Sequence, residues 1–160
     1  MVPVLLHLIA APAHAGEPTV TVNDAGLTVT CVMDADEEQV KALMADSEKV
    51  YSASEDLESY TVTKAGRCDR IETEAKGIVS LRLKTERCQS GDGSWYDRLV
   101  SSDDFEEYEV KWYVRPVQGG TEVVYQLKAS LSAPVPDRAV YKAAGEAART
   151  QLTNLQMLLD

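Results

Sequence analysis

The segment that decides the fold is "YEVKWYVRPVQGGTEVVYQLKASLSAPVP", residues 108–136. Apolar and polar side chains alternate on both sides of Gly119 and Gly120, and a period of two is typical of a strand with one buried face. A Gly-Gly pair between two such runs predicts a β-hairpin. Pro134 and Pro136 then end the second strand, because proline lacks the N–H that a ladder needs. The segment therefore predicts an antiparallel hairpin with one apolar face.

The same period of two extends upstream of this hairpin and begins at Ser59. Short breaks of turn residues interrupt the alternation at residues 65–66, 76–77, 90–93, 102–104 and 119–120. Connections this short join antiparallel neighbours, so six successive strands are predicted. Residues 19–33, "TVTVNDAGLTVTCVM", alternate as well and predict either one long strand or a hairpin.

Helical periods flank this run of strands. Asp34 is expected to begin a first helix, with Glu37 in capping-box spacing, and a second short helix is expected over residues 48–57. After the prolines, Asp137 can cap a long helix that runs to residue 159. The apolar stripe of that helix consists of Tyr141, Ala144, Ala148, Leu152, Leu155 and Leu159. The element order predicts an α+β fold, in which a curved antiparallel sheet of about seven strands wraps around the long C-terminal helix and two short helices follow the first strand.

The first residues, "MVPVLLHLIAAPAHA", have the form of a signal peptide, because an apolar run precedes small residues at Ala13 and Ala15. The run is too short to span a bilayer, which needs roughly 20 residues. A buried N-terminal strand is the alternative. We expect residues 1–15 to be a cleaved signal peptide, residues 16–160 to form one domain, and the protein to be periplasmic or secreted. Cleavage would remove both His7 and His14, which excludes histidine-dependent catalysis and histidine-ligated zinc.

The formal net charge of −10 argues against nucleic acid and anionic lipid surfaces as partners. Paired acids such as Glu72 and Glu74 could hold a metal or transfer protons, but they lie among charges that suit a solvated strand. The loop "SGDGS", residues 90–94, lacks the full ligand series of a calcium site. We therefore expect no catalytic residue, metal ligand or cofactor, no membrane segment after cleavage, and a monomer.

Three cysteines remain after the expected cleavage. Cys31 shares a strand face with apolar neighbours and is expected to be a small buried residue. Cys68 and Cys88 flank two strands joined near Lys76 and Gly77, so they should lie nearly opposite each other. In an oxidising compartment a structural disulfide between them is favoured over free thiols.

The element order and the decisive hairpin resemble the helix-grip fold of START-like (SRPBCC) proteins, which include polyketide cyclases, coenzyme Q-binding proteins and pollen-allergen-like carriers. Residues 35–46, "ADEEQVKALMAD", are similar to the first helix of that superfamily. The hairpin carries the most distinctive matches, which are Trp112, the turn of Gly119, Gly120 and Thr121, Tyr125 and Pro136. Lys111 stands where many relatives have a glycine. The resemblance implies a cavity between sheet and last helix, which relatives use for lipids, sterols, quinones or polyketides.

The residues themselves also suggest such a cavity. Ala144, Gly145 and Ala148 give the last helix little side-chain volume where it crosses the sheet, so the helix either packs closely or leaves space. We expect space, opposite an apolar wall that includes Val79. The candidate ligand-binding residues are Leu81, Leu83, Tyr108, Val110, Trp112, Val114, Val123, Tyr125, Leu127, Tyr141, Ala144, Ala148 and Leu152. The alternative is that all of these side chains fill a core.

The sequence leaves three classes of function open. The first is an exported, non-catalytic protein that binds a hydrophobic or amphipathic small molecule such as a lipid, quinone or polyketide. The second is an enzyme of the polyketide cyclase or aromatase type, and the third is an interaction module with a filled core. An inward-facing Arg or Glu beside Tyr108 or Tyr125 would favour the enzyme, whereas an unbroken apolar wall would favour the carrier. Arg82, Arg98 and Arg115 alternate away from the apolar faces and are expected to point outward.

Overall fold

The computed structural model describes residues 16–77 and 80–160 as one antiparallel sheet that wraps around a long helix. The strand order across the sheet is β1-β2-β8-β7-β6-β5-β4-β3. The strands are β1 (Thr19–Asn23), β2 (Gly26–Met33), β3 (Leu57–Ala65), β4 (Cys68–Ala75), β5 (Leu81–Gln89), β6 (Trp95–Ser101), β7 (Phe105–Val117) and β8 (Gly120–Leu131). This arrangement confirms the predicted α+β fold class. The expected signal peptide and Val79 lie outside the described residues.

The sheet has eight strands, whereas the order of elements in the sequence predicted about seven. The difference arises at the N-terminus, where residues 19–33 form a hairpin and not one long strand. Asn23 pairs with Gly26 across a two-residue turn, and β2 then pairs with β8. The decisive hairpin of the sequence therefore lies in the middle of the sheet, between β2 and β6.

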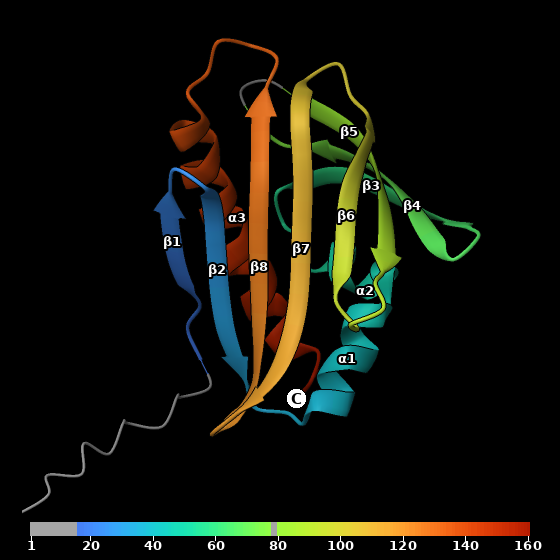
Figure 1. The fold of residues 1–160 in the computed structure, drawn as a ribbon, viewed down its shortest axis with the longest axis vertical. Coiled ribbons are helices and arrows are strands. Elements are labelled where there is room, and N and C mark those ends of the chain that lie inside the picture. The colour runs from blue at the N-terminus through green and yellow to red at the C-terminus, as the bar shows by residue number, and fades with distance from the viewer. Residues whose placement is uncertain (1–15, 78–79) are drawn as a thin grey trace, which may run out of the picture.

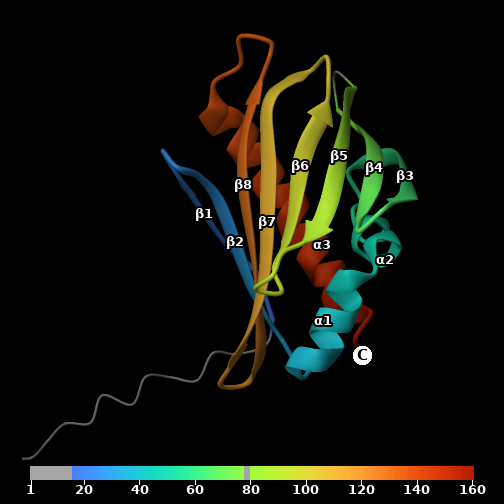
Figure 2. The ribbon, with the colours of Figure 1, turned by 45° about the vertical axis from the view of Figure 1, so that its right-hand side comes forward.

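Three helices complete the fold: α1 (Glu37–Ala45), α2 (Ser47–Ser52) and α3 (Asp137–Met157). α3 lies behind the sheet in Figure 1, and the turned view in Figure 2 shows the sheet curving around it. α1 and α2 lie beside the last turns of α3 in both views. None of the described helices combines the length and the apolar character needed to cross a membrane.

The start of α1 differs from its prediction. Asp36, and not Asp34, is the N-cap: its carboxylate accepts a hydrogen bond from the Gln39 backbone N–H at 2.9 Å. The Gln39 side chain accepts in return from the Asp36 backbone N–H at 3.2 Å, so the capping box uses Gln39 in place of Glu37. β2 extends to Met33, and the two residues after it are needed to turn the chain before the helix begins.

The other helix ends also differ in detail. α2 ends at Ser52, earlier than expected, because the chain must cross to Leu57 at the start of β3. Asp137 is the first residue of α3 and does not cap it; Pro136 occupies the N-cap position and has no side-chain hydrogen bond to give. α3 ends at Met157, close to the expected residue 159.

Gly145 sets how closely α3 approaches the sheet. A Cβ at this position would lie 2.9 Å from Val20 Cγ1 and 3.3 Å from Leu27 Cδ1, which is tighter than normal packing. α3 therefore packs tightly onto β1 and β2 on its Gly145 side. The predicted alternatives of close packing and open space are both realised, on different sides of the same helix.

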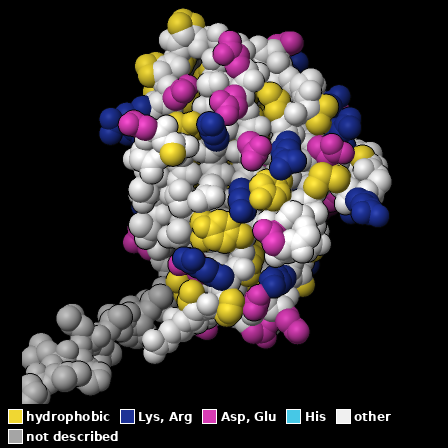
Figure 3. Space-filling model, viewed as in Figure 1, with side chains coloured by type: hydrophobic (Ala, Val, Ile, Leu, Met, Phe, Trp, Pro, Cys, Tyr) yellow, Lys and Arg dark blue, Asp and Glu magenta, His cyan; other side chains and the backbone are white. Residues whose placement is uncertain are grey.

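The outer face of the sheet carries mixed charges, which Figure 3 shows interspersed over β7, β8 and their neighbours. Arg82, Arg98 and Arg115 are exposed here, as predicted, and form ion pairs with Glu74, Glu109 and Glu122. Exposed pairs of this kind contribute little to stability. The outer face is therefore a solvated surface, and the apolar wall faces α3.

Candidate ligand-binding cavity

A cavity of about 400 Å³ lies between the concave face of the sheet, α2 and the side of α3 opposite Gly145. Most of its walls are apolar, and alanines make up the wall on α3. Its mouth lies near the first turns of α3, where the lining residues Val135, Ala139 and Ala143 are exposed to solvent. Small side chains on α3 thus leave space where larger ones would fill a core.

Nine of the thirteen residues proposed from the sequence line this cavity: Leu81, Leu83, Tyr108, Val110, Trp112, Tyr125, Leu127, Ala144 and Ala148. Each strand residue in this set lies on the inward face of β5, β7 or β8. Strand alternation was sufficient to find them, because a period of two fixes which face a side chain occupies.

The other four proposed residues, Val114, Val123, Tyr141 and Leu152, do not line the cavity. Val114 and Val123 pair with each other at the end of the hairpin where α1 packs against β7 and β8, so helix α1 closes the space there. Leu152 is fully buried in the core. The Tyr141 hydroxyl accepts a hydrogen bond from the Ala129 backbone N–H at 3.3 Å, which fixes that ring against β8.

A buried ion pair at the inner end of the cavity was not predicted from the sequence. Arg87 on β5 and Asp97 on β6 are cross-strand partners, each 3% exposed, with 3.2 Å between Arg87 Nε and Asp97 Oδ1. Asp97 Oδ2 also accepts hydrogen bonds from the Tyr51 hydroxyl at 3.0 Å and from Trp112 Nε1 at 3.2 Å. Asp97 lines the cavity, whereas Arg87 does not.

The Arg87 side chain also contacts the helices that pack against the sheet. Its Nη1 donates to the Met44 carbonyl at 2.7 Å and lies 3.4 Å from Ser47 Oγ, so the guanidinium ties the end of α1 and the start of α2 to the sheet. Burial raises the pKa of the Asp97 carboxyl, while Arg87, Trp112 and Tyr51 act in the opposite direction by stabilising the carboxylate. The pairing offsets much of the cost of burying both charges, although Arg87 Nη2 has no hydrogen-bond partner among the described residues.

Tyr108 and Tyr125 are among the neutral polar residues that line the cavity, together with Tyr51, Ser54, Thr73 and Gln151. The Tyr125 ring packs edge-on against Trp112, with 4.8 Å between the ring centroids. Burial raises the pKa of both Tyr108 and Tyr125, and the nearby carboxylates of Asp97 and Asp56 add to the increase. Both phenols therefore stay protonated near neutral pH and can donate hydrogen bonds to a ligand.

Two further charged residues, Asp56 and Lys76, also line the cavity. Burial raises the pKa of Asp56, and a backbone hydrogen bond and Lys76 oppose this. Lys76 Nζ lies 3.4 Å from the Glu55 carbonyl oxygen, on an exposed side chain.

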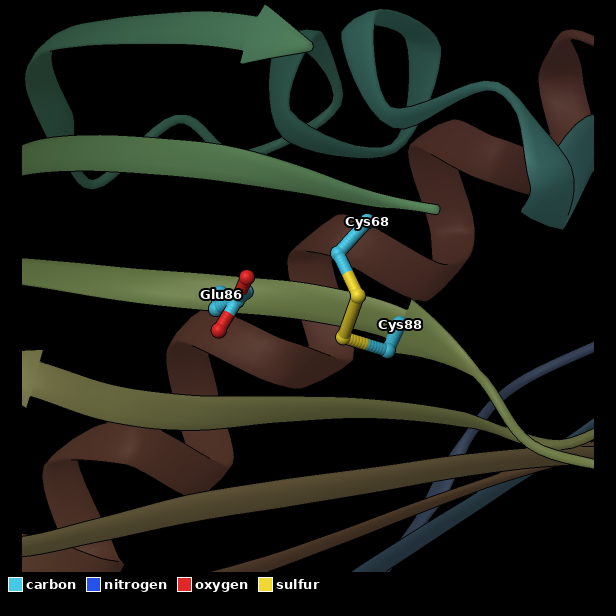
Figure 4. A group of neighbouring side chains, drawn as sticks. All are labelled: Cys68, Glu86 and Cys88. Atoms are coloured by element: carbon cyan, nitrogen blue, oxygen red, sulfur yellow. A yellow bond between two sulfur atoms is a disulfide. The ribbon is translucent and has the colours of Figure 1, made fainter. Parts of the chain in front are cut away.

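Within the described ranges, one group of three potential metal ligands lies close together: Cys68, Glu86 and Cys88. Figure 4 shows Glu86 beside the disulfide that joins Cys68 on β4 to Cys88 on β5, directly across from each other with Cα atoms 4.5 Å apart. Both sulfurs are bonded to each other, so neither is available as a thiolate ligand. The group does not fit a metal ion in this state. Cys31 is free and buried.

No family model matches the sequence, and no curated protein matches it either. Solved structures do resemble the fold. A protein from Thermus thermophilus, TTHA0849, superposes with a TM-score of 0.73 at 23% identity, covering 82% of this chain and 94% of its own. A START superfamily protein from Mycobacterium smegmatis gives 0.69 at 18% identity, with 90% and 97% covered. The Zhui aromatase/cyclase from Streptomyces sp. R1128 gives 0.70 at 11% identity, with 82% and 91% covered.

These structures cover nearly all of the described residues. At sequence identities of 11–23% they show a likeness of fold. The chain has the helix-grip fold of START-like proteins, as the Trp112 to Pro136 hairpin indicated. The fold alone leaves the ligand and any reaction open, because one fold hosts many functions.

Proposed function

We propose that the protein is an exported, non-catalytic binding protein for a hydrophobic or amphipathic small molecule, held between the sheet and α3. The observation that carries this proposal is the cavity of about 400 Å³ with apolar walls and an open mouth. Sites for small molecules are typically apolar clefts of roughly 300–1,000 Å³ with a few placed polar groups. Tyr108, Tyr125 and Asp97 are such groups here.

The same cavity makes a filled-core interaction module the weaker interpretation. A core packed like other protein interiors leaves few voids larger than a water molecule. The alanines of α3 at positions 143, 144, 147 and 148 instead face open space. Lipids, quinones and polyketide-like molecules remain the ligand classes that the fold suggests.

An enzyme of the polyketide cyclase type is the second candidate. The apolar wall is broken by two carboxylates, Asp56 and Asp97, and of these Asp97 is the larger influence on both Tyr108 and Tyr125. A general acid or base must reach the reacting atom of the substrate. Asp97 is held by Arg87, Tyr51 and Trp112, and these contacts suit a structural role. We therefore favour binding without catalysis.

Export is part of the proposal. The small residues at positions 13 and 15 after an apolar run support cleavage. The disulfide between Cys68 and Cys88 is also of the kind that persists in oxidising compartments. The intact mass of protein recovered from the periplasm or medium tests this step, and a species that retains Met1 would contradict it.

The binding proposal is tested with Nile red, a neutral apolar dye whose emission reports a dry environment. We expect saturable binding of one dye per chain and displacement of the dye by lipid extracts from cells that export the protein. Ala144→Phe should abolish binding because Ala144 lines the cavity, whereas Arg98→Ala on the outer face should leave binding unchanged. Absence of saturable binding, or equal binding by Ala144→Phe, would contradict the proposal.

A further inference from the structure

The polar groups that face the cavity are mostly hydrogen-bond donors without charge. Tyr108 and Tyr125 lie on neighbouring strands, β7 and β8, and both line the cavity. A side-chain hydrogen bond joins the two phenols, and burial keeps both protonated. Because one phenol donates to the other, a ligand oxygen that reaches this part of the wall meets one free phenol O–H.

The charged side chains that line the cavity near these phenols are carboxylates, and their cationic partners, Arg87 for Asp97 and Lys76 for Asp56, lie away from the phenols. Asp97 and Asp56 both line the cavity, and both act on the two phenols through their charge. The single cationic side chain among the described lining residues is Lys76, at the mouth, where it is exposed. Arg87 is no substitute, because it does not line the cavity and its guanidinium contacts Asp97, Met44 and Ser47.

We propose that the cavity selects uncharged ligands that carry a hydrogen-bond acceptor, such as a ketone or ester oxygen, and rejects ligands whose buried end is a carboxylate. This selectivity rests on the binding function proposed above. It assigns Tyr108 and Tyr125 as the residues that determine specificity.

The physical reason is the cost of burying a charge. A carboxylate placed against the phenols would leave water and lie near two other carboxylates. Among the described residues no cation lines the cavity at that depth, because Arg87 lies behind Asp97 and already pairs with it. A ketone or ester oxygen brings no charge and accepts from the free phenol O–H directly. A ligand without an acceptor would bury the one phenol O–H that is not used between Tyr108 and Tyr125, which also costs affinity.

The test compares three forms of one dimethylaminonaphthalene fluorophore that differ in a single substituent: acetyl, ethyl and carboxylate. We expect the acetyl form to bind at least about fivefold more tightly than the ethyl form, as one neutral hydrogen bond would give. We expect it to bind at least about tenfold more tightly than the carboxylate form, from the cost of a buried unpaired charge. This comparison on the unmodified protein does not depend on whether any variant folds.

Variants then assign the selectivity to the two phenols. Tyr108→Phe and Tyr125→Phe should each lower affinity for the acetyl form and leave the ethyl affinity unchanged or higher, so that the two affinities converge, because a donor that the ethyl form leaves unpaired has been removed. Tyr113→Phe is the matched control, because Tyr113 lies on the outer face beside Lys111. Equal loss of both affinities in the two cavity variants would overturn the role of the phenols.

The outcomes separate this inference from the function on which it rests. A carboxylate form that binds as tightly as the acetyl form would overturn the selectivity while supporting a binding function. If Lys76→Gln abolished that binding, the carboxylate would pair with Lys76 at the mouth. The assumption that the carboxylate is the buried end of the ligand would then be wrong. Failure of all three forms to bind would contradict the binding function itself.

Discussion

Placing one large side chain at two adjacent positions of α3 distinguishes a real cavity from a filled core. Ala144 lines the cavity, whereas Gly145 packs against β1 and β2. In Ala144→Phe the ring enters space of about 400 Å³. Burying a phenylalanine side chain gains about 1.5–3 kcal/mol relative to exposure, and lost rotamer freedom and weaker helix propensity offset about 1–2 kcal/mol of this. We expect the free energy of unfolding to change by between about −0.5 and about +2 kcal/mol.

Gly145→Phe should have the opposite effect. Even its Cβ would lie 2.9 Å from Val20 Cγ1, so the sheet or the helix must move. Overpacking of this kind costs about 1–3 kcal/mol or more, and we expect a loss of at least about 2 kcal/mol. Urea unfolding followed by tryptophan fluorescence measures both variants under one set of conditions. A similar loss in Ala144→Phe and Gly145→Phe would refute the argument that α3 has one packed and one open side.

Three further predictions concern the buried ion pair and the cysteines. Asp97→Leu should lower the free energy of unfolding by about 3–5 kcal/mol, because it leaves the Arg87 charge buried and unpaired. The double variant Arg87→Met, Asp97→Leu should lose less than the two single variants added together, and additive losses in a double-mutant cycle would argue against coupling. Denatured, unreduced protein should show one free thiol, and three thiols would contradict the pairing of Cys68 with Cys88. The double variant Cys68→Ser, Cys88→Ser should lower the free energy of unfolding by about 3 kcal/mol, as expected for cysteines separated by 20 residues. Burial raises the pKa of the Cys31 thiol from 9.0 to about 11, so its contribution to stability is complete below pH 9 and is lost as the pH rises toward 11. Native protein at pH 8 should therefore react with iodoacetamide far more slowly than unfolded protein, and equal rates would contradict the burial.

Much of the fold follows from patterns that act over a few residues. Alternation assigned the inward faces of β5, β7 and β8, because a side-chain period of two leaves one face for the core. The pairing of Cys68 with Cys88 was predicted from a short connection between two strands. A turn at residues 76–77 alone would have placed Cys68 opposite Thr85, but β4 ends at Ala75 and β5 begins at Leu81, and this longer connection brings Cys68 opposite Cys88. The turn at Gly119 and Gly120 could also be predicted from the residues at the turn itself. Gly120 has a φ of 149°, in a region that other residues avoid.

The features that could not be predicted depend on contacts between distant elements. A charged residue in an alternating strand is usually solvated, yet Arg87 and Asp97 are buried because β5 and β6 place them opposite each other. The end of the cavity was misplaced because the position of α1, which closes the space at Val114 and Val123, is not encoded in the strands themselves. The start of α1 differs from the prediction because two overlapping pairs, Asp34 with Glu37 and Asp36 with Gln39, have the capping-box spacing. The length of β2 selects the pair that begins at Asp36.

The central claim, that a small molecule binds between the sheet and α3, is tested most directly by NMR of alanine methyl groups. In protein labelled at these methyls, titration with the acetyl fluorophore should shift the resonances of Ala144, Ala147 and Ala148, which line the cavity. The methyls of Ala42 and Ala45 on α1 are outside the cavity and should not move. Saturable shifts confined to the α3 alanines would support the account. Shifts of the α1 methyls without those of α3, or no shifts at all, would contradict it.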